Sequence, residues 1–251
     1  MSVNKVCALL IGRKGSTGFP GKNIYPVMGR PLVAYPLMAA QSSRSVDRIF
    51  VSTDCSDLAE IAGGYGAELI ERPPELATKE ALGEDVFVHG YNMIKKKLAD
   101  EGGTVELMVL LFANAATITG QLIDEGVETL RKNSKFDSAV TTSVYNMWSP
   151  LRARKLDEEG CLQPFVPFET FGDPRTLNCD RDSQGEVHFA DMSVSVVRPF
   201  CLESMEDGLL PQKWMGRKIA PIRSWGGCDI DYEWQVPMVE FWLRKHGIKE
   251  A

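Results

Sequence analysis

The sequence predicts an α/β protein with a doubly wound, mostly parallel sheet and an inserted arm. Between residues 6 and 144, short apolar runs alternate with longer stretches of helical periodicity, and strand–helix–strand alternation is typical of a parallel sheet. From residue 145 to residue 184 the periodicity fails and four prolines interrupt an aromatic stretch. Structureless segments of that length are uncommon, so we expect an arm or lid that packs on a partner subunit or over a site. A long surface loop is the alternative, and residues 1–251 are expected to form one domain.

The first elements follow from apolar runs and the residues that interrupt them. Residues 6–11 form a continuous apolar run that ends at Gly12, as expected of a buried strand. Pro31 precedes the apolar residues 32–40, and proline suits the first turn of a helix because an N–H at that position has no partner within the helix. A helix is therefore expected over residues 32–40, with a kink at Pro36.

The later elements are predicted in the same way. Residues 48–52 indicate a second strand, and a helix at 58–65 is expected to end at Gly66, since glycine tolerates the left-handed conformation common after a helix. The remaining elements are expected, in chain order, to be a strand at 68–70, a helix at 83–100, a strand at 107–112, a helix at 120–132, strands at 138–144, 192–197 and 218–222, and a helix at 233–246. We expect the first 145 residues to form one doubly wound unit.

Charge and composition exclude several classes of protein. The chain has 28 basic and 34 acidic side chains, a net charge of -6 and no long block of like charges. Duplex binding depends on phosphate neutralisation by Lys and Arg, so no nucleic-acid partner is expected. The apolar runs are shorter than the ~20 residues that cross a bilayer, and the N-terminus lacks a cleavage-site pattern. We therefore expect no membrane association and a cytoplasmic location. The scattered cysteines and histidines do not match the spacing of a zinc site.

The loop after the first strand, residues 12–23, combines glycines with cations. Its glycines let the backbone approach a ligand, while Arg13, Lys14 and Lys22 supply positive charge. Such a loop at the carboxyl end of the first strand suits a phosphate chain. Neither G-x-x-x-x-G-K followed by Ser or Thr nor G-x-G-x-x-G fits, because Asn23 follows Lys22 and the glycine spacing differs. A flexible basic turn is the alternative.

Residues 11–23 resemble the P-A-R-G-G-S-K-G-I-P-x-K-N signature of the acylneuraminate-type cytidylyltransferases, which make CMP-activated acidic sugars. Further matches to this family follow in order and spacing at residues 29–32, 51–54, 59–62, 65–68 and 72–77. Near the C-terminus, the Asp-Ile-Asp stretch at 229–231 looks like the family's D-I-D. The resemblance implies a fold of the nucleotide-diphospho-sugar transferase type and a homodimer.

The resemblance also implies roles for individual residues. Arg13 and Lys22 would hold the triphosphate with Asn23 beside them, and Asp229 and Asp231 would bind a catalytic magnesium ion (Mg2+). These four charged residues are the expected catalytic set, and the expected nucleotide-binding residues are Gly12, Arg13, Lys14, Gly15, Ser16, Lys22, Asn23 and Asn114. Alternate residues of a strand share a face, so two carboxylates on a strand could meet one hard cation while the residue between them enters the core. A solvated acidic pair is the alternative.

The chain departs from the family pattern in the middle of the sequence. The family segment L-Q-P-T-S-P-L-R aligns with residues 111–118, where Phe112 replaces the Gln. Asn114 is the remaining amide and could read a base edge, with a turn or helix cap as the alternative. Thr17 replaces the family's Lys, whose charge Lys14 could supply.

The acceptor end of the expected site departs from the family as well. Arg175 and Arg181 could pair a substrate carboxylate in bidentate fashion, with surface salt bridging as the alternative. Where the family has Asn-Gly before a strand that faces the sugar, this chain has Asp191-Met192. Acceptor recognition is therefore expected to differ from that of the family.

The predicted activity is nucleotidyl transfer. A sugar hydroxyl attacks the α-phosphate of CTP and expels pyrophosphate, with catalysis by positioning, magnesium and the basic loop. The resemblance implies an acidic α-keto sugar as acceptor and a CMP-sugar as product. The alternative is a sugar-1-phosphate nucleotidyltransferase that uses GTP or another nucleotide. A glycosyltransferase with a metal-binding D-x-D and a non-catalytic nucleotide-binding paralogue are less favoured.

Overall fold

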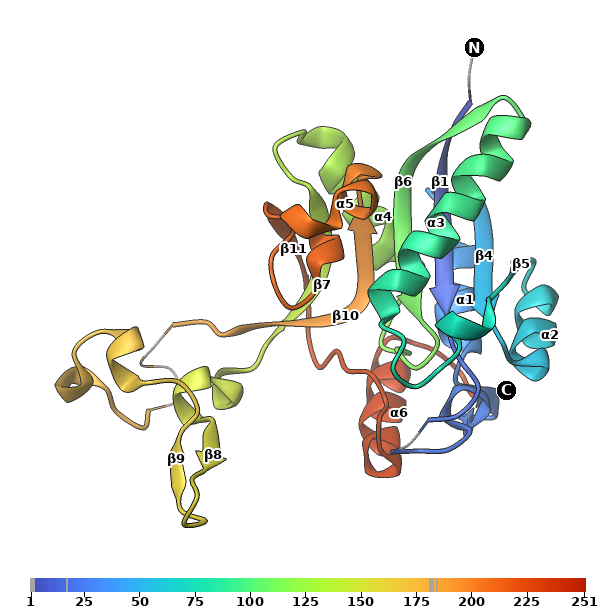
Figure 1. The fold of residues 1–251 in the computed structure, drawn as a ribbon. Helices are drawn as coiled ribbons and strands as arrows, with labels where there is room; N and C mark the ends of the chain where they lie inside the picture. Colours follow the sequence, from blue (N-terminus) through green and yellow to red (C-terminus); the bar gives the residue numbers. More distant parts are fainter. Residues whose placement is uncertain (1–2, 17, 181–182, 184) are drawn as a thin grey trace.

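The structure is a computed structural model that describes residues 3–16, 18–180, 183 and 185–251. A seven-stranded sheet runs through it in the order β11-β7-β10-β6-β1-β4-β5 (Figure 1). Its strands are β1 (Val3–Ile11), β4 (Arg48–Thr53), β5 (Glu68–Glu71), β6 (Gly103–Phe112), β7 (Ser138–Val144), β10 (His188–Val197) and β11 (Ile219–Ser224). β10 runs antiparallel to β6 and β7, whereas the other neighbouring strands pair in parallel. The predicted mostly parallel sheet is confirmed.

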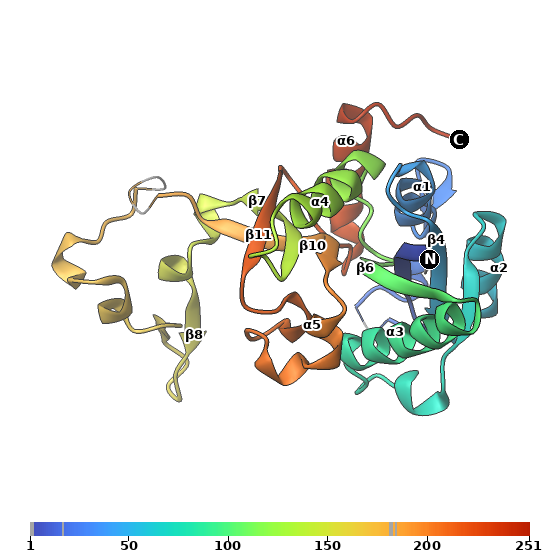
Figure 2. The ribbon, with the colours of Figure 1, turned by 90° about the horizontal axis from the view of Figure 1, so that it is seen from above.

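Helices cover both faces of this sheet (Figure 2). They are α1 (Ala34–Ser42), α2 (Ser56–Gly64), α3 (Gly83–Asp100), α4 (Gly120–Lys132), α5 (Phe200–Glu203) and α6 (Val236–Lys245). Because alternate strand residues point to opposite faces, Ala8 and Leu10 pack in a buried cluster with α1, α2 and α4, whereas Leu9 packs in another with α3 and α5. The doubly wound architecture is therefore confirmed. Among the described residues, none of the helices combines the length and apolar character needed to cross a membrane.

A third buried cluster lies beneath the loop that follows β1. Phe19 of that loop and Ile230 pack with Trp242 of α6. The short hairpin of β2 (Pro26–Val27) and β3 (Arg30–Pro31) contributes Val27 to the same cluster. The basic loop and the acidic Asp-Ile-Asp stretch therefore share one apolar support, although more than 200 residues separate Phe19 from Ile230.

The predicted elements are largely confirmed, and α3, α4 and β7 have the expected bounds. The helix expected from residue 32 begins at Ala34, because Pro31 pairs with Pro26 in the β2–β3 hairpin instead of opening the helix. The expectation that the first 145 residues form one unit is wrong. β10 comes from later in the chain and inserts between β6 and β7, so these two strands join one sheet only through it.

The predicted inserted arm is present. After β7 the chain leaves the sheet, and it returns at β10 (Figure 1). The arm, defined here as the described residues between 145 and 187, carries an antiparallel hairpin of β8 (Arg154–Leu156) and β9 (Leu162–Pro164). Large apolar side chains are exposed on it, with Leu156 67%, Leu162 70% and Phe165 60% accessible. That the arm covers a partner or a site stays a prediction.

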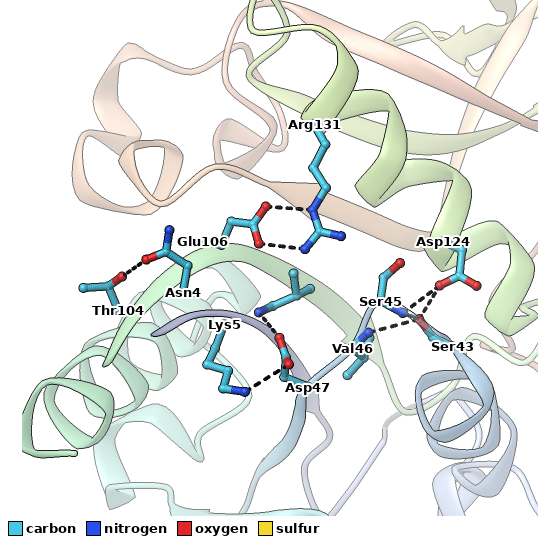
Figure 3. A network of polar contacts seen from close by, with 11 residues as sticks. Asn4, Lys5, Ser43, Ser45, Val46, Asp47, Thr104, Glu106, Asp124 and Arg131 are labelled. Atoms are coloured by element: carbon cyan, nitrogen blue, oxygen red, sulfur yellow. Dashed lines mark hydrogen bonds and ion pairs between the residues drawn. The ribbon is translucent and has the colours of Figure 1, made fainter. Parts of the chain in front are cut away.

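At the end of the sheet opposite the loop after β1, polar contacts join the turn after α1 to α4 (Figure 3). The buried Asp124 carboxylate of α4 accepts hydrogen bonds from Ser43 Oγ at 2.7 Å and from the backbone N–H of Ser45 at 3.0 Å. The backbone N–H and Nε of Arg44 donate to its other oxygen. Burial alone would raise the pKa of Asp124, but these hydrogen bonds outweigh it and hold the pKa below its ordinary value.

Replacing Asp124 by asparagine is expected to lower the free energy of unfolding at pH 7 by ~1–3 kcal/mol, because an amide cannot accept all of these donors. The Asp124 pKa is lowered by folding, so its contribution is present above the unfolded pKa of about 3.9 and is lost as the pH falls through the folded value. Urea unfolding of both proteins at pH 7 and near pH 3 measures this. Glu128→Gln, on the exposed face of the same helix, is the control; an Asp124 difference that stays constant on acidification contradicts the prediction.

Candidate active site

A cavity of about 440 Å³ opens at the carboxyl ends of β1 and β6. The chain leaves β1 for β4 and β5 on one side and returns to β6 on the other, and open α/β sheets bind ligands where the strand order reverses in this way. The volume lies within the range of about 300–1,000 Å³ usual for ligand pockets. Its lining residues are Ile11, Gly12, Arg13, Gly15, Ser16, Gly18, Lys22, Asn23, Arg72, Leu76, Ala81, Gly83, Val86, Phe112, Asn114, Asp231 and Tyr232.

The loop after β1 forms a cationic wall of this cavity. Asn23 Nδ2 donates to the backbone oxygen of Arg13 at 3.2 Å, and the backbone N–H of Gly12 donates to the oxygen of Ser52 at 3.3 Å. Gly15 has a φ of 84°, a left-handed conformation that glycine adopts without steric cost. The predicted nucleotide-binding residues that line the cavity are Gly12, Arg13, Gly15, Ser16, Lys22, Asn23 and Asn114.

Lys14 is the predicted nucleotide-binding residue that the structure places elsewhere. Its backbone N–H donates to Asp54 Oδ1 at 2.8 Å. Lys14 lines a second hollow of about 280 Å³, which other residues of the loop share with Cys55 and Leu58 at the start of α2. Lys14 is therefore not brought into the lining of the main cavity.

An ion pair joins the basic loop to the acidic segment near the C-terminus. Lys22 Nζ lies 2.5 Å from Asp231 Oδ1; the lysine side chain is largely buried and the aspartate is exposed. The backbone N–H of Asp231 donates to Gln235 Oε1 at 2.8 Å, which holds the start of this turn in place. Two predicted catalytic residues that are 209 positions apart therefore meet at the rim of the cavity.

Asn114 holds the acidic segment from the opposite side. Its Nδ2 donates to Asp229 Oδ2 and to the backbone oxygen of Ile230, both at 3.2 Å, and its backbone oxygen accepts from the N–H of Ile230 at 2.9 Å. The Asn114 amide therefore anchors the segment that contains Asp229 and Ile230, a role that the residues around Asn114 in the sequence did not indicate. Base recognition by Asn114 stays a prediction.

Asp229 lies half-buried behind Asp231. The expectation that both aspartates lie on a strand is wrong, because the segment between β11 and the turn at Glu233 has no strand conformation. Ile230 nevertheless enters the core, as expected. Burial raises the pKa of Asp229, and the charge of Asp231 raises it further, while Lys22 and Asn114 act in the opposite direction.

The acidic pair has the chemistry of a site for a hard divalent cation. Such a cation prefers carboxylate oxygens, and it would relieve the cost that burial and mutual repulsion impose on ionised Asp229. Within the described ranges, no group of three or more His, Cys, Asp or Glu side chains is placed to hold a metal ion. Magnesium keeps several waters and takes further ligands from substrate phosphates, so two carboxylates are a suitable donor set for it; that it binds here stays a prediction.

Arg72 is a lining residue that the sequence analysis did not assign to the site. Its Nη2 donates to the backbone oxygen of Ser52 at 2.5 Å, and this contact holds the guanidinium beside the loop. Burial lowers the pKa of Arg72; the charge of Asp54 opposes this shift and that of Arg13 adds to it. The signal for Arg72 was its place at the head of the matched stretch 72–77, directly after β5.

Arg175, one of the two predicted acceptor-binding arginines, is not found at the cavity. Arg175 lies on the arm, where its exposed guanidinium pairs with Asp173 at 2.7 Å. It is absent from the described lining of the cavity. Arg181 lies outside the described residues. Within one chain, the structure therefore shows Arg175 only in a surface salt bridge.

A doubly wound sheet with a cationic glycine loop at its reversal point, and an acidic pair facing that loop, defines an α/β protein of the nucleotidyltransferase type. A family model for cytidylyltransferases matches residues 7–156. The chain belongs to the cytidylyltransferase family, and the resemblance to its acylneuraminate type is confirmed.

Relatives and solved structures support the same assignment. The chain is 35% identical over 161 residues to an N-acylneuraminate cytidylyltransferase from Escherichia coli, a match that covers 64% of this chain and 36% of that protein. It is 38% identical over 159 residues to a CMP-N,N'-diacetyllegionaminic acid synthase from Legionella pneumophila, covering 63% and 66% of the two chains. The chain thus spans about a third of the E. coli relative. A CMP:2-keto-3-deoxy-manno-octonic acid synthetase complexed with CTP has the same fold, with a TM-score of 0.67 and 12% identity over 97% of this chain and 100% of that one.

Proposed function

We propose that the protein transfers the cytidylyl group of CTP to the hydroxyl of an acidic α-keto sugar. The hydroxyl oxygen bonds to the α-phosphorus and its proton is released to water, while the bond from the α-phosphorus to the oxygen that bridges to the β-phosphate breaks and pyrophosphate leaves with that electron pair. The observation that carries the proposal is the Lys22–Asp231 contact, which places the cationic loop opposite the acidic segment across one cavity. Membership of the cytidylyltransferase family, whose relatives activate acidic sugars, supports CTP and such an acceptor.

The cationic wall is suited to the triphosphate. Arg13, Lys22 and Arg72 line the cavity together, and charge-assisted hydrogen bonds to phosphate are stronger than neutral ones. The loop adds backbone N–H groups around the left-handed Gly15, an arrangement that binds anions. These groups are held before the ligand arrives, so they can stabilise charge that develops on the α-phosphate.

We propose that Asp229 and Asp231 hold magnesium. The bound ion would neutralise charge on the transferring phosphate. In the protein as described, Lys22 compensates the charge of Asp231. A nucleotide that enters with its cation can take over both partners, since its phosphates attract Lys22 and its cation attracts Asp231. The ion pair therefore neutralises these two charges, and both side chains are available to a nucleotide and its cation.

Turnover is expected to be at least about tenfold faster with CTP than with UTP, GTP or ATP, because an unmatched buried hydrogen-bonding group costs ~1–3 kcal/mol. The test is pyrophosphate release at equal nucleotide concentrations, with magnesium and a panel of keto acid sugars and sugar-1-phosphates. Phe112 lines the cavity where the family pattern has Gln, so backbone groups of the loop would read the base. A preference for GTP, or for a sugar-1-phosphate, would move the assignment to the alternative nucleotidyltransferase.

We also propose a homodimer in which the arm packs on a second copy. Leu156, Leu162 and Phe165 are each at least 60% exposed, and an exposed apolar group of this kind favours a protein contact. The double variant Leu156→Lys/Leu162→Lys is expected to be monomeric by light scattering, while Leu210→Lys, which changes an exposed leucine outside the arm, leaves the dimer intact. A monomeric parent protein would contradict the proposal.

We propose that Arg175 binds the carboxylate of the acceptor sugar. This role requires that the arm reach a cavity, either in its own chain or in the second copy of the dimer. We place the protein in the cytoplasm, and its six free thiols suit a reducing compartment.

A further inference from the structure

β10 contains a strained bulge at the point where it passes the acidic segment. Its pairing with β7 shifts register between Ala190 and Ser195. Within this bulge Met192 has a φ of 57°, a left-handed conformation that is costly for a residue with a side chain. Such strain persists only where the surroundings enforce it, and it is common at functional sites.

The bulge turns a carboxylate into the interior. Asp191 is only 8% exposed, and the hydrogen-bond donors that it has among the described residues are neutral. Its Oδ1 accepts from Thr141 Oγ1 at 2.5 Å and from the backbone N–H of Ser193 at 3.1 Å, while Oδ2 accepts from Ser143 Oγ at 3.0 Å. A buried carboxylate needs several donors to offset its desolvation, and these three come from β7 and β10.

Two routes of hydrogen bonds through side-chain hydroxyls connect the bulge to the acidic segment. Ser143 Oγ, which donates to Asp191, accepts the backbone N–H of Gly227 at 3.0 Å. The hydroxyl of Ser193 lies 2.9 Å from Thr117 Oγ1, which accepts the backbone N–H of Cys228 at 3.0 Å. The two residues directly before Asp229 are therefore both anchored through their backbone.

The backbone at Gly227 lies directly against the carboxylate of Asp191. A Cβ atom added at Gly227 would overlap Asp191 Oδ2. On the other side of Asp229, both backbone groups of Ile230 are held by Asn114. Hydrogen bonds thus hold the backbone on either side of Asp229. Asp191 belongs to the set of contacts that holds the side of Gly227.

We propose that Asp191 is a positioning residue of the active site, acting through Ser143 and Thr117 to hold Asp229 in its place opposite Lys22. The carboxylate accepts a hydrogen bond from the Ser143 hydroxyl, so the oxygen of that hydroxyl is free to accept the N–H of Gly227. An amide at position 191 would offer a donor to one of the hydroxyls and disturb this order. The inference rests on the proposed function, because it concerns the same carboxylate.

Two matched comparisons test the relay. Ser143→Ala removes the link to Gly227. Thr141→Val removes another donor to Asp191; the Thr141 hydroxyl also bonds to the backbone of Val194 in β10 and has no described contact with the acidic segment. Thr117→Val removes the link to Cys228, and Thr117→Ser retains the hydroxyl. For each variant we would measure kcat and KM with CTP, and the rise in melting temperature that magnesium causes in the absence of substrate.

Ser143→Ala and Thr117→Val are expected to lose about 10- to 100-fold in kcat, the scale set by small misplacements of reacting groups. Their KM for CTP should stay within about threefold of the parent, because the basic loop is untouched, and their magnesium response should shrink. Thr117→Ser and Thr141→Val should keep the parent's kcat, although Thr141→Val melts at a lower temperature.

Equal losses of melting temperature in Ser143→Ala and Thr141→Val, with kcat and the magnesium response preserved in both, would overturn the proposal and leave Asp191 a purely structural group. If Ser143→Ala does not fold, the Thr117 pair decides by the same criteria. A parent protein without cytidylyl transfer would contradict the proposed function instead, and the magnesium response of the variants would still report on the relay.

Discussion

Replacing Lys22 by alanine is expected to weaken CTP binding about 10- to 100-fold, because a hydrogen bond to a charged partner contributes ~1.5–3 kcal/mol. The fold should tolerate the change. Lys22 contacts Asp231, whose side chain is 57% exposed, and an ion pair with an exposed partner stabilises a protein by only ~0–1 kcal/mol. Titration calorimetry with CTP measures the binding, and thermal unfolding without nucleotide measures the stability.

Lys14→Ala is the comparison within the same loop. Lys14 lines the second hollow and not the main cavity, so its removal should weaken CTP binding by less than about threefold. Arg13→Ala should resemble Lys22→Ala, since Arg13 lines the main cavity. CTP affinity unchanged in both Arg13→Ala and Lys22→Ala would exclude this loop as the phosphate site.

Replacing either Asp229 or Asp231 by asparagine is expected to lower kcat about 100- to 1,000-fold, the loss typical when one electrostatic group facing the transition state is removed. As in Lys22→Ala, the fold should tolerate these changes, and the melting temperature of both variants should equal or exceed that of the parent. Burial and the charge of Asp231 raise the pKa of Asp229, so ionisation of this carboxyl costs stability in the folded protein.

The pH dependence of the Asp229→Asn effect follows from the direction of that shift. A carboxyl with a raised pKa favours folding while it is protonated, and this contribution is lost as the pH rises from the unfolded value of about 3.9 through the folded value. The advantage of Asp229→Asn should therefore grow with pH above about 4. Melting curves across this range measure it, with Glu233→Gln as the acidic control of the same segment.

Magnesium should separate the acidic pair from other acidic residues. A ligand that binds only the folded state stabilises it by an amount that depends on its affinity, so magnesium should raise the melting temperature of the parent and of Glu233→Gln more than that of the two aspartate variants. Equal responses in all four proteins would place the ion elsewhere and refute this role for Asp229 and Asp231.

Local patterns were enough to predict elements whose residues interact mainly with their neighbours in the chain. α3 and α4 begin and end where the 3.6-residue periodicity does, and β7 coincides with the stretch 138–144 that was predicted as a strand. Pro31 shows the limit of such reasoning: its propensity for the first turn of a helix is real, but pairing with Pro26 in a hairpin decides its conformation.

The same distinction between local and distant contacts applies to the functional site. The basic loop was predicted as a unit because its glycines and cations are consecutive, and Gly12, Arg13, Lys22 and Asn23 all line the cavity. Lys14 shares that composition and yet belongs to another hollow, since the direction of a loop side chain depends on the backbone path. Arg72 was missed because the matched stretch 72–77 does not show that the end of β5 lies beside β4, where Arg72 contacts the backbone oxygen of Ser52.

The sequence by itself determined the α/β class, the helices on either side of a mostly parallel sheet, the arm and the glycine-rich, cationic character of the first loop, since each depends on residues close together in the chain. Only the tertiary structure decided that β10 separates β6 from β7, that Lys22 meets Asp231, and that Asp191 lies behind the segment of Asp229. These contacts join residues between about 36 and 209 positions apart. Their energies arise from pairing, burial and charge between distant segments, and no local propensity or periodicity encodes such partners.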